Sequence, residues 1–79
     1  MITPESIKAS IEQGMKSSHV SVAGDGRHFE AVVVSDEFAG KNRVQRHQRV
    51  YQALGDSMRD EMIHALTMKT YTPQEWEKQ

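Results

Sequence analysis

Two strand-forming segments separated by a helix-forming segment constrain the fold more than any other feature of the chain. The first runs from Phe29 to Val34 and ends in four consecutive apolar residues, a pattern typical of a strand covered on both faces. The second runs from about Ile63 to Tyr71, with Leu66 and Met68 on one face and polar residues on the other. A strand, a helical crossover and a second strand in one sheet usually lie parallel. We therefore expect a sheet whose second and third strands are parallel.

The pattern before this unit predicts a helix and a hairpin. Thr3 is a candidate N-cap before Pro4, and a four-residue apolar repeat predicts a helix that ends near residues 17–18. The repeat consists of Ile7, Ile11 and Met15. Alternation over residues 20–23 predicts a short strand, and Gly24-Asp25-Gly26 supplies the small residues of a tight hairpin turn.

The crossover segment carries an unusual charge pattern. Residues 41–55 contain four Lys/Arg and no Asp/Glu, although the whole chain has a net charge of -1. The four cations are Lys41, Arg43, Arg46 and Arg49. A helix that begins near residues 42–43 and ends at Gly55 is expected, with an inner stripe of Val44, His47 or Gln48, Tyr51 and Leu54. The basic helix 41–54 offers a face for an acidic partner, either nucleic acid or protein.

Two shorter helical pieces complete the expected order. Asp56 can cap a short helix through Met62, and residues 72–75 fit a capping box that returns Trp76 to the body of the domain. The predicted order is helix, strand, strand, helix, short helix, strand. It indicates a single α+β domain over residues 1–79, with a three-stranded mixed sheet and its helices on one face.

Composition and motif content exclude several classes of protein. The chain has no cysteine, so it has no disulfide, no thiolate ligand and no thiol nucleophile. No apolar run approaches the ~20 residues of a membrane-spanning helix, and no N-terminal signal pattern is present, so a cytoplasmic protein is expected. Nucleophile-elbow, phosphate-loop and zinc-protease motifs are absent as well, which predicts a protein that is not an enzyme.

Two of the four histidines are expected at one edge of the sheet. His28 directly follows the hairpin turn, and His64 is expected to open the last strand. Because parallel strands start at the same edge, the two imidazoles could face one ligand, and imidazole suits iron, zinc and copper. The alternative is that both are ordinary surface or hydrogen-bonded side chains. His47 is expected to pack beside the inner stripe of the basic helix, and His19 is expected only to be solvated.

Several short motifs occur in an order that resembles the BolA family. They are Phe38-Ala39-Gly40-Lys41, Arg43-Val44-Gln45-Arg46-His47, Val50-Tyr51, Ile63-His64-Ala65-Leu66, Lys69-Thr70-Tyr71-Thr72-Pro73 and Glu75-Trp76. The resemblance implies a class II KH-like αββαβ fold with a short extra helix, a BolA-like domain over the whole chain, and the acid-stress-linked bacterial branch of the family. Asn42 is a departure, since many members have serine there, but asparagine also caps helices.

The resemblance also implies a function. Proteins of this kind are partners and regulators of monothiol glutaredoxins in iron–sulfur and iron homeostasis. The histidine that corresponds to His64 is implicated in a [2Fe-2S] cluster shared with the glutaredoxin and glutathione. The second ligand is expected from the hairpin loop, where members carry cysteine or histidine, which indicates His28. The isolated chain is then expected to be a monomer that binds no cofactor tightly.

A DNA-binding role is the alternative, because members of the family have also been described as DNA-binding transcription regulators. Under this alternative, Lys41, Arg43, Arg46 and Arg49 contact phosphates. The Gly-x-x-Gly clamp of KH domains is not reproduced, because Arg43 stands where a second glycine would follow Gly40. The slightly acidic net charge and the scarcity of aromatic residues favour a protein partner over a DNA reader.

Overall fold

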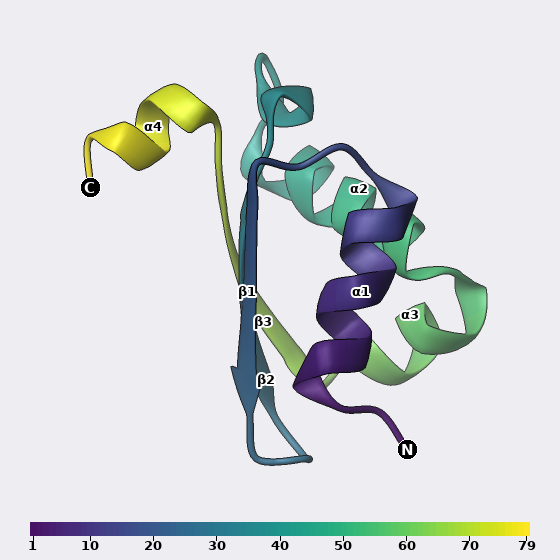
Figure 1. Ribbon diagram of the computed structural model, residues 1–79. Coiled ribbons are helices and arrows are strands. Elements are labelled where there is room, and N and C mark those ends of the chain that lie inside the picture. The colour runs from purple at the N-terminus through teal and green to yellow at the C-terminus, as the bar shows by residue number, and fades with distance from the viewer.

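The computed structural model describes residues 1–79 and contains four α-helices, one 3-10 turn and three strands (Figure 1). In chain order they are α1 (Pro4–Gly14), β1 (His19–Gly24), β2 (Phe29–Val34), the 3-10 helix η1 (Asp36–Phe38), α2 (Arg43–Leu54), α3 (Asp56–Met62), β3 (Leu66–Tyr71) and α4 (Pro73–Glu77). This order confirms the α+β fold that the sequence patterns predict.

The sheet has the predicted mixed topology. Its order is β1-β2-β3, with β1 antiparallel to β2 and β2 parallel to β3. Strand β3 begins at Leu66, so its expected start at Ile63 is wrong by three residues. The helical turns of α3 continue into this segment, because the Ile63 amide donates to the Arg59 carbonyl and the Ala65 amide donates to the Met62 carbonyl. His64 therefore lies in the turn before β3 and does not open the strand.

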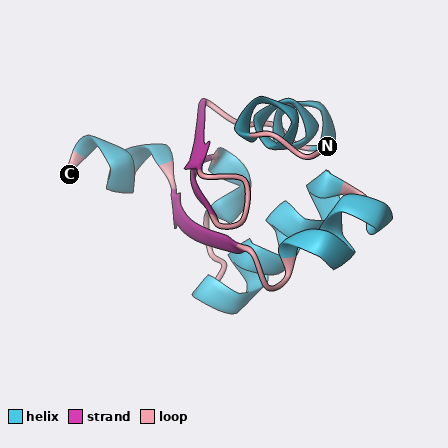
Figure 2. Ribbon diagram, turned by 90° about the horizontal axis from the view of Figure 1, so that it is seen from below, coloured by secondary structure: helices cyan, strands magenta, loops and turns pink.

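The core lies between one face of the sheet and helices α1 to α3, which Figures 1 and 2 show on the same side of the strands. Its fully buried side chains include Ile7, Ile11, Val33, Phe38 and Val50. The capping residues expected at the starts of the helices are in place, because the side chains of Thr3, Asn42 and Thr72 each accept an amide of the first turn. Asp56 is different: it is the first residue of α3 and provides no side-chain cap.

The expected inner stripe of α2 is partly wrong. Leu54 is buried and Tyr51 is half-buried, but Val44 is 64% exposed. Arg46 is directed inward instead, since its guanidinium carbon lies 5.9 Å from the centre of the Phe38 ring. Arg46, Val50 and Leu54 are four residues apart and share one stripe, so Val44, two residues from Arg46, lies on the opposite side of the helix.

Helix α1 ends at Gly14, three residues before its expected end. Its C-terminal residues meet α2 at close range: a Cβ atom added to Gly14 would lie 2.3 Å from the Ala53 carbonyl oxygen. The chain then becomes extended at Met15, and the Lys16 carbonyl accepts a hydrogen bond from the Ser35 hydroxyl. Continuing the helix would remove this connection between the end of α1 and the end of β2.

The other face of the sheet is covered at one end only, where α4 lies (Figures 1 and 2). The Trp76 ring stacks on His19 at 5.1 Å between ring centres and lies 5.4 Å from the Tyr71 ring. His19 and Tyr71 flank Val34 in the sheet register, and Val34 is only 1% exposed. The expected return of Trp76 to the body is confirmed. The expectation that His19 is only solvated is wrong, because His19 is a stacking partner.

Candidate metal-binding edge and basic groove

The parallel register places His28 and His64 at the same edge of the sheet. The Phe29 amide donates to the Ala65 carbonyl at 2.8 Å, and Phe29 pairs with Leu66. His28 directly precedes Phe29 and His64 directly precedes Ala65, so the two histidines flank this hydrogen bond. Both residues are exposed, and neither imidazole makes a hydrogen bond within the chain. The sequence-based argument for their proximity is therefore supported by the backbone, although His64 belongs to a turn.

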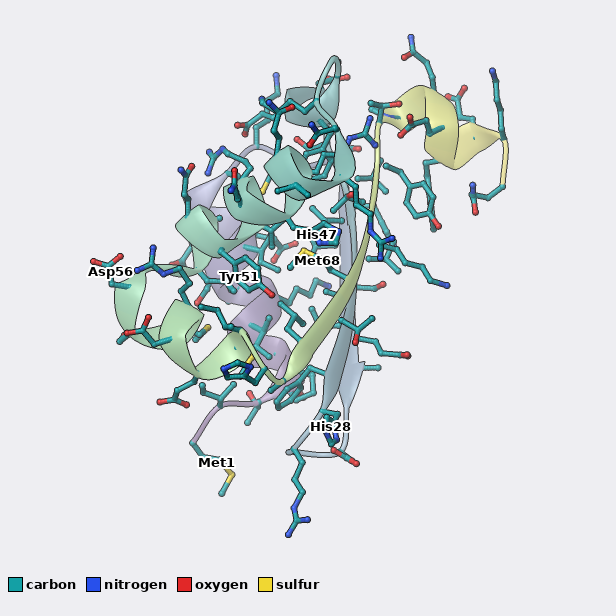
Figure 3. All side chains as sticks on the ribbon, turned by 180° about the vertical axis from the view of Figure 1, so that it is seen from behind. Met1, His28, His47, Tyr51, Asp56 and Met68 are labelled. Atoms are coloured by element: carbon teal, nitrogen blue, oxygen red, sulfur yellow. The ribbon has the colours of Figure 1, made fainter.

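The hairpin that presents His28 is held by Asp25. One oxygen of this carboxylate accepts the amides of Arg27 and His28, each at 2.9 Å. These hydrogen bonds, with the one from His28 contributing most, lower the pKa of Asp25 below its ordinary value of 3.8. Gly26 has φ of 95°, which completes the turn without steric strain. The result is a fixed loop backbone with a free imidazole at the hairpin end, where Figure 3 shows His28.

The donor set at this edge is too small for a complete metal site. The structure contains no group of three or more His, Cys, Asp or Glu side chains that could hold a metal ion. A [2Fe-2S] cluster has four protein ligands, usually cysteine thiolates, with histidine replacing cysteine in some proteins. The two imidazoles would fill two of these four positions, and the other two ligands would have to come from another molecule.

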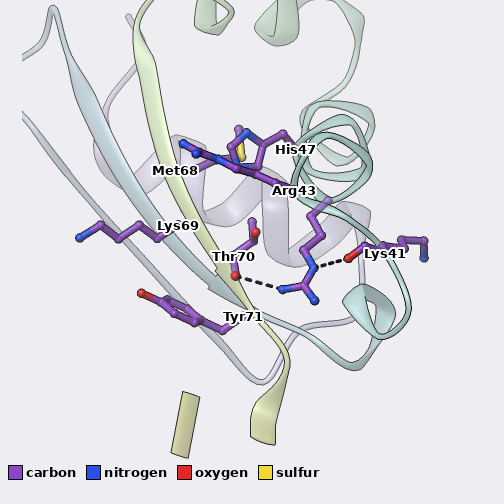
Figure 4. Close-up of a pocket in the computed structure, with 8 residues that line it drawn as sticks. Lys41, Arg43, His47, Met68, Lys69, Thr70 and Tyr71 are labelled. Carbon is purple, nitrogen blue, oxygen red and sulfur yellow. Dashed lines mark hydrogen bonds between the residues drawn. The ribbon is translucent and has the colours of Figure 1, made fainter. Parts of the chain in front are cut away.

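A basic groove lies between α2 and β3 (Figure 4). Its volume is ≈ 370 Å³. It is lined by Lys41, Arg43, Arg46, His47, Met68, Lys69, Thr70 and Tyr71. No acidic side chain is among them. His47 lies beside Met68 between the helix and the strand (Figure 3). Burial lowers the pKa of His47 below 6.5, and the charge of Arg43 lowers it further, so His47 is neutral near pH 7.

The Arg46 guanidinium donates most of its hydrogen bonds within the chain and stabilises the fold. Its Nε donates to the Lys41 carbonyl at 2.9 Å and its Nη1 donates to the Thr70 carbonyl at 3.3 Å, as the dashed lines in Figure 4 mark. The same guanidinium donates to both carboxylate oxygens of Glu75, at 2.7 and 3.3 Å. The hydrogen bond from Arg46 is the main reason that the pKa of Glu75 falls to about 2. Arg46 thereby joins α2, β3 and α4.

Arg49 also has partners within the chain. Its Nε donates to Glu37 at 2.9 Å and its Nη2 donates to the Gly14 carbonyl at 3.2 Å. The second oxygen of Glu37 accepts the Lys16 amide at 2.8 Å. The hydrogen bond from Arg49 and then that from Lys16 lower the pKa of Glu37. Arg49 therefore connects α2 with η1 and with the end of α1.

The four cations expected to contact one partner, Lys41, Arg43, Arg46 and Arg49, differ in how far they are already bound within the chain. The Lys41 ammonium donates to the Glu37 carbonyl, whereas Arg43 is exposed and has no partner within the chain. Lys69 of β3 also lines the groove without an ion pair, and sequence reasoning missed it. The strand alternation placed Lys69 on the polar face of β3 but did not indicate that α2 would lie beside it.

No helix combines the length and the apolar character that a membrane-spanning segment requires.

Comparisons with known proteins agree with the fold. Residues 1–75 match the family described as BolA-like protein. The acid stress protein IbaG of Escherichia coli is 39% identical over 70 residues, which cover 89% of this chain and 83% of that protein. The DNA-binding transcriptional regulator BolA of Haemophilus influenzae is 44% identical over 61 residues, 77% of this chain and 58% of that one. A BolA protein homologue from Coxiella burnetii has a solved structure with a TM-score of 0.83, 51% identity and coverage of 98% of this chain and 99% of that one. The family match spans nearly the whole chain and the fold agrees with it, so this chain belongs to the BolA-like family.

Proposed function

We propose that this chain is a cytoplasmic, non-enzymatic partner and regulator of a monothiol glutaredoxin, and that the two proteins share a [2Fe-2S] cluster in iron–sulfur and iron homeostasis. The observation that carries the proposal is the pair of free, exposed imidazoles of His28 and His64 on either side of the Phe29–Ala65 hydrogen bond. Some relatives are named as an acid stress protein or as a DNA-binding transcriptional regulator, and these names agree with a role outside catalysis.

The chemistry of the ligands explains why a partner is needed. This chain has no cysteine and offers two imidazoles, so the remaining ligands must come from elsewhere. The cysteine of a monothiol glutaredoxin and the thiol of glutathione would supply them. Histidine in place of thiolate removes negative charge from a cluster and raises its reduction potential. The isolated chain, with half of the ligands, remains without a tightly bound cofactor.

The test is reconstitution with a monothiol glutaredoxin, glutathione, iron and sulfide. The mixture is expected to form a heterodimer whose visible circular dichroism differs from that of the glutaredoxin alone. His64→Ala should abolish the difference and His28→Ala should weaken it, whereas His28→Cys should retain the complex with a lower reduction potential. His19→Ala is the control, because it removes an imidazole from the other end of the sheet. A parental spectrum in the His64→Ala mixture would remove His64 from the site.

Nucleic-acid binding is a second candidate function, favoured by the groove between α2 and β3. Three cations reach this groove without a carboxylate partner, namely Lys41, Arg43 and Lys69. Several relatives are named DNA-binding transcriptional regulators. Binding of duplex DNA should weaken with salt by a slope of ~0.9 per phosphate contact, and Arg43→Glu with Lys69→Glu should reduce it without changing cluster formation. The candidate fails if the parent protein does not bind duplex DNA at low salt beside a positive control.

A further inference from the structure

Glu75 is the only carboxylate that hydrogen-bonds a residue lining the basic groove. Both of its oxygens accept from the Arg46 guanidinium, at 2.7 and 3.3 Å. A guanidinium with two parallel donors binds carboxylate and phosphate in the same two-point manner. The face of Arg46 that could receive a phosphate is therefore occupied by an anion of the chain itself.

The element that supplies this anion is small and lies apart from the core. α4 has five residues, none of them buried, and lies on the face of the sheet opposite helices α1 to α3. It is held by the Arg46–Glu75 ion pair, by the capping box with Thr72 and by the stacking of Trp76 on His19. The Glu75 side chain is 47% exposed, whereas the Arg46 side chain is only 14% exposed, so an external anion can reach the guanidinium only where Glu75 moves away.

The rest of the groove has a charge pattern that suits a chain of phosphates. Arg43 and Lys69 lie on two different elements, α2 and β3, and both are exposed without an ion pair. His47 adds no positive charge near pH 7 but has ring nitrogens free of hydrogen bonds within the chain. Cations spread along a groove neutralise successive charges of a polyanion, as phosphodiester binding requires.

We propose that the groove binds a nucleic-acid phosphodiester and that α4 regulates this binding. In the docked α4, the Glu75 carboxylate occupies the position on Arg46 that a phosphate would take. This inference rests on the nucleic-acid function proposed above. While α4 is docked, Glu75 competes for Arg46 and repels an incoming phosphate. When Glu75 is displaced or neutralised, Arg46 becomes available as a fourth groove cation beside Lys41, Arg43 and Lys69.

The experiment compares two variants that remove the same charge from α4. Glu75→Gln removes the competing carboxylate but keeps the helix cap, because glutamine at this position also accepts the Thr72 amide. Glu77→Gln changes the net charge equally, and the Glu77 side chain has no hydrogen bond or ion pair. Binding of a 20-base-pair DNA duplex is measured over a salt series for both variants and the parent.

The Glu75→Gln protein is expected to bind the duplex more tightly than the Glu77→Gln protein, by on the order of tenfold for one charge-assisted contact. Its salt dependence should be steeper by ~0.9. Adding Arg46→Gln to Glu75→Gln should remove the gain, which shows that the gain depends on this guanidinium.

Each other result overturns the proposal in a recognisable way. Equal affinities of the two variants, with a parent that binds DNA, would refute regulation by α4 and leave nucleic-acid binding in place. No binding by any of the proteins would refute both. If Glu75→Gln bound polyglutamate more tightly than Glu77→Gln did but showed no gain in DNA affinity, the groove would accept acidic protein. That result would refute phosphodiester binding in the groove. Thermal melting of each variant verifies that it is folded.

Discussion

Arg49 and Arg43 are both cations of α2, but the structure predicts opposite consequences of replacing them by glutamine. Arg49→Gln removes the hydrogen bonds to Glu37 and to the Gly14 carbonyl, and the side chains of Arg49 and Glu37 are only 26% and 29% exposed. Hydrogen bonds to charged groups contribute roughly 1.5–3 kcal/mol, and partial exposure reduces the total, so a loss of about 2 kcal/mol in unfolding free energy is expected. Arg43 has no partner, and its replacement should change stability by no more than about 0.5 kcal/mol.

Thermal and urea denaturation followed by circular dichroism measure both effects. For a domain of this size, about 2 kcal/mol corresponds to a fall in Tm of roughly 8–16 °C. A double-mutant cycle of Arg49→Gln with Glu37→Gln should give a coupling of about 1 kcal/mol. Equal melting temperatures for Arg49→Gln and Arg43→Gln would refute the structural role of Arg49. That result would also mean that Arg49 is available to bind an external partner.

Two further changes test the packing of α1 and the docking of α4. Gly14→Ala should lower the unfolding free energy by roughly 1–2 kcal/mol, because the new Cβ would lie 2.3 Å from the Ala53 carbonyl oxygen. This cost exceeds the gain of about 1 kcal/mol that alanine usually gives over glycine in a helix. Gln13→Ala is the control, and a Gly14→Ala protein that is more stable than the parent would contradict the close approach. The pKa of Glu75 falls from 4.5 to about 2 on folding, so the docking of α4 is stabilised above pH 4.5 and lost as the pH falls through about 2. Fluorescence of Trp76, the only tryptophan, should report this acid transition, and an identical transition in Glu75→Gln would exclude Glu75 as its cause.

Features of the fold that depend on neighbours in the sequence were predictable. Thr3, Asn42 and Thr72 accept amides three residues later, so the rule that identifies them is local. The parallel pairing of β2 and β3 follows from the strand–helix–strand order, and this pairing alone brings His28 and His64 to one edge. The extra turn after α3 was not predictable from alternation, because Ile63 fits a strand pattern as well as a helical one.

Features that depend on distant partners could not be read from periodicity. Arg46 faces inward because it donates hydrogen bonds to Thr70 and Glu75. These partners lie 24 and 29 positions away in the sequence, so the local apolar pattern does not indicate them and favours Val44 as the inward residue. The segregation of positive charge in α2 predicts a face that is free to bind an acidic partner. Two of its arginines instead bind Glu37 and Glu75, which approach from η1 and α4. Only the positions of these acids distinguish a cation that stabilises the fold from one that can bind a partner.

The two candidate surfaces occupy different parts of β3, and the residues that define them, His64 and Glu75, lie beyond its opposite ends. His64 precedes the first residue of the strand, Leu66, whereas the groove is lined by residues 68–71 and Glu75 of α4 meets Arg46 beside Thr70. A strand of six residues spans roughly 17 Å, and no residue belongs to both surfaces. Substitutions at sites this far apart usually have additive effects. His64→Ala should therefore leave the DNA affinity of the Glu75→Gln protein unchanged, and Glu75→Gln should leave the glutaredoxin complex spectrum unchanged. Any competition between glutaredoxin and DNA would then arise from overlap of the two bulky partners and not from a shared residue.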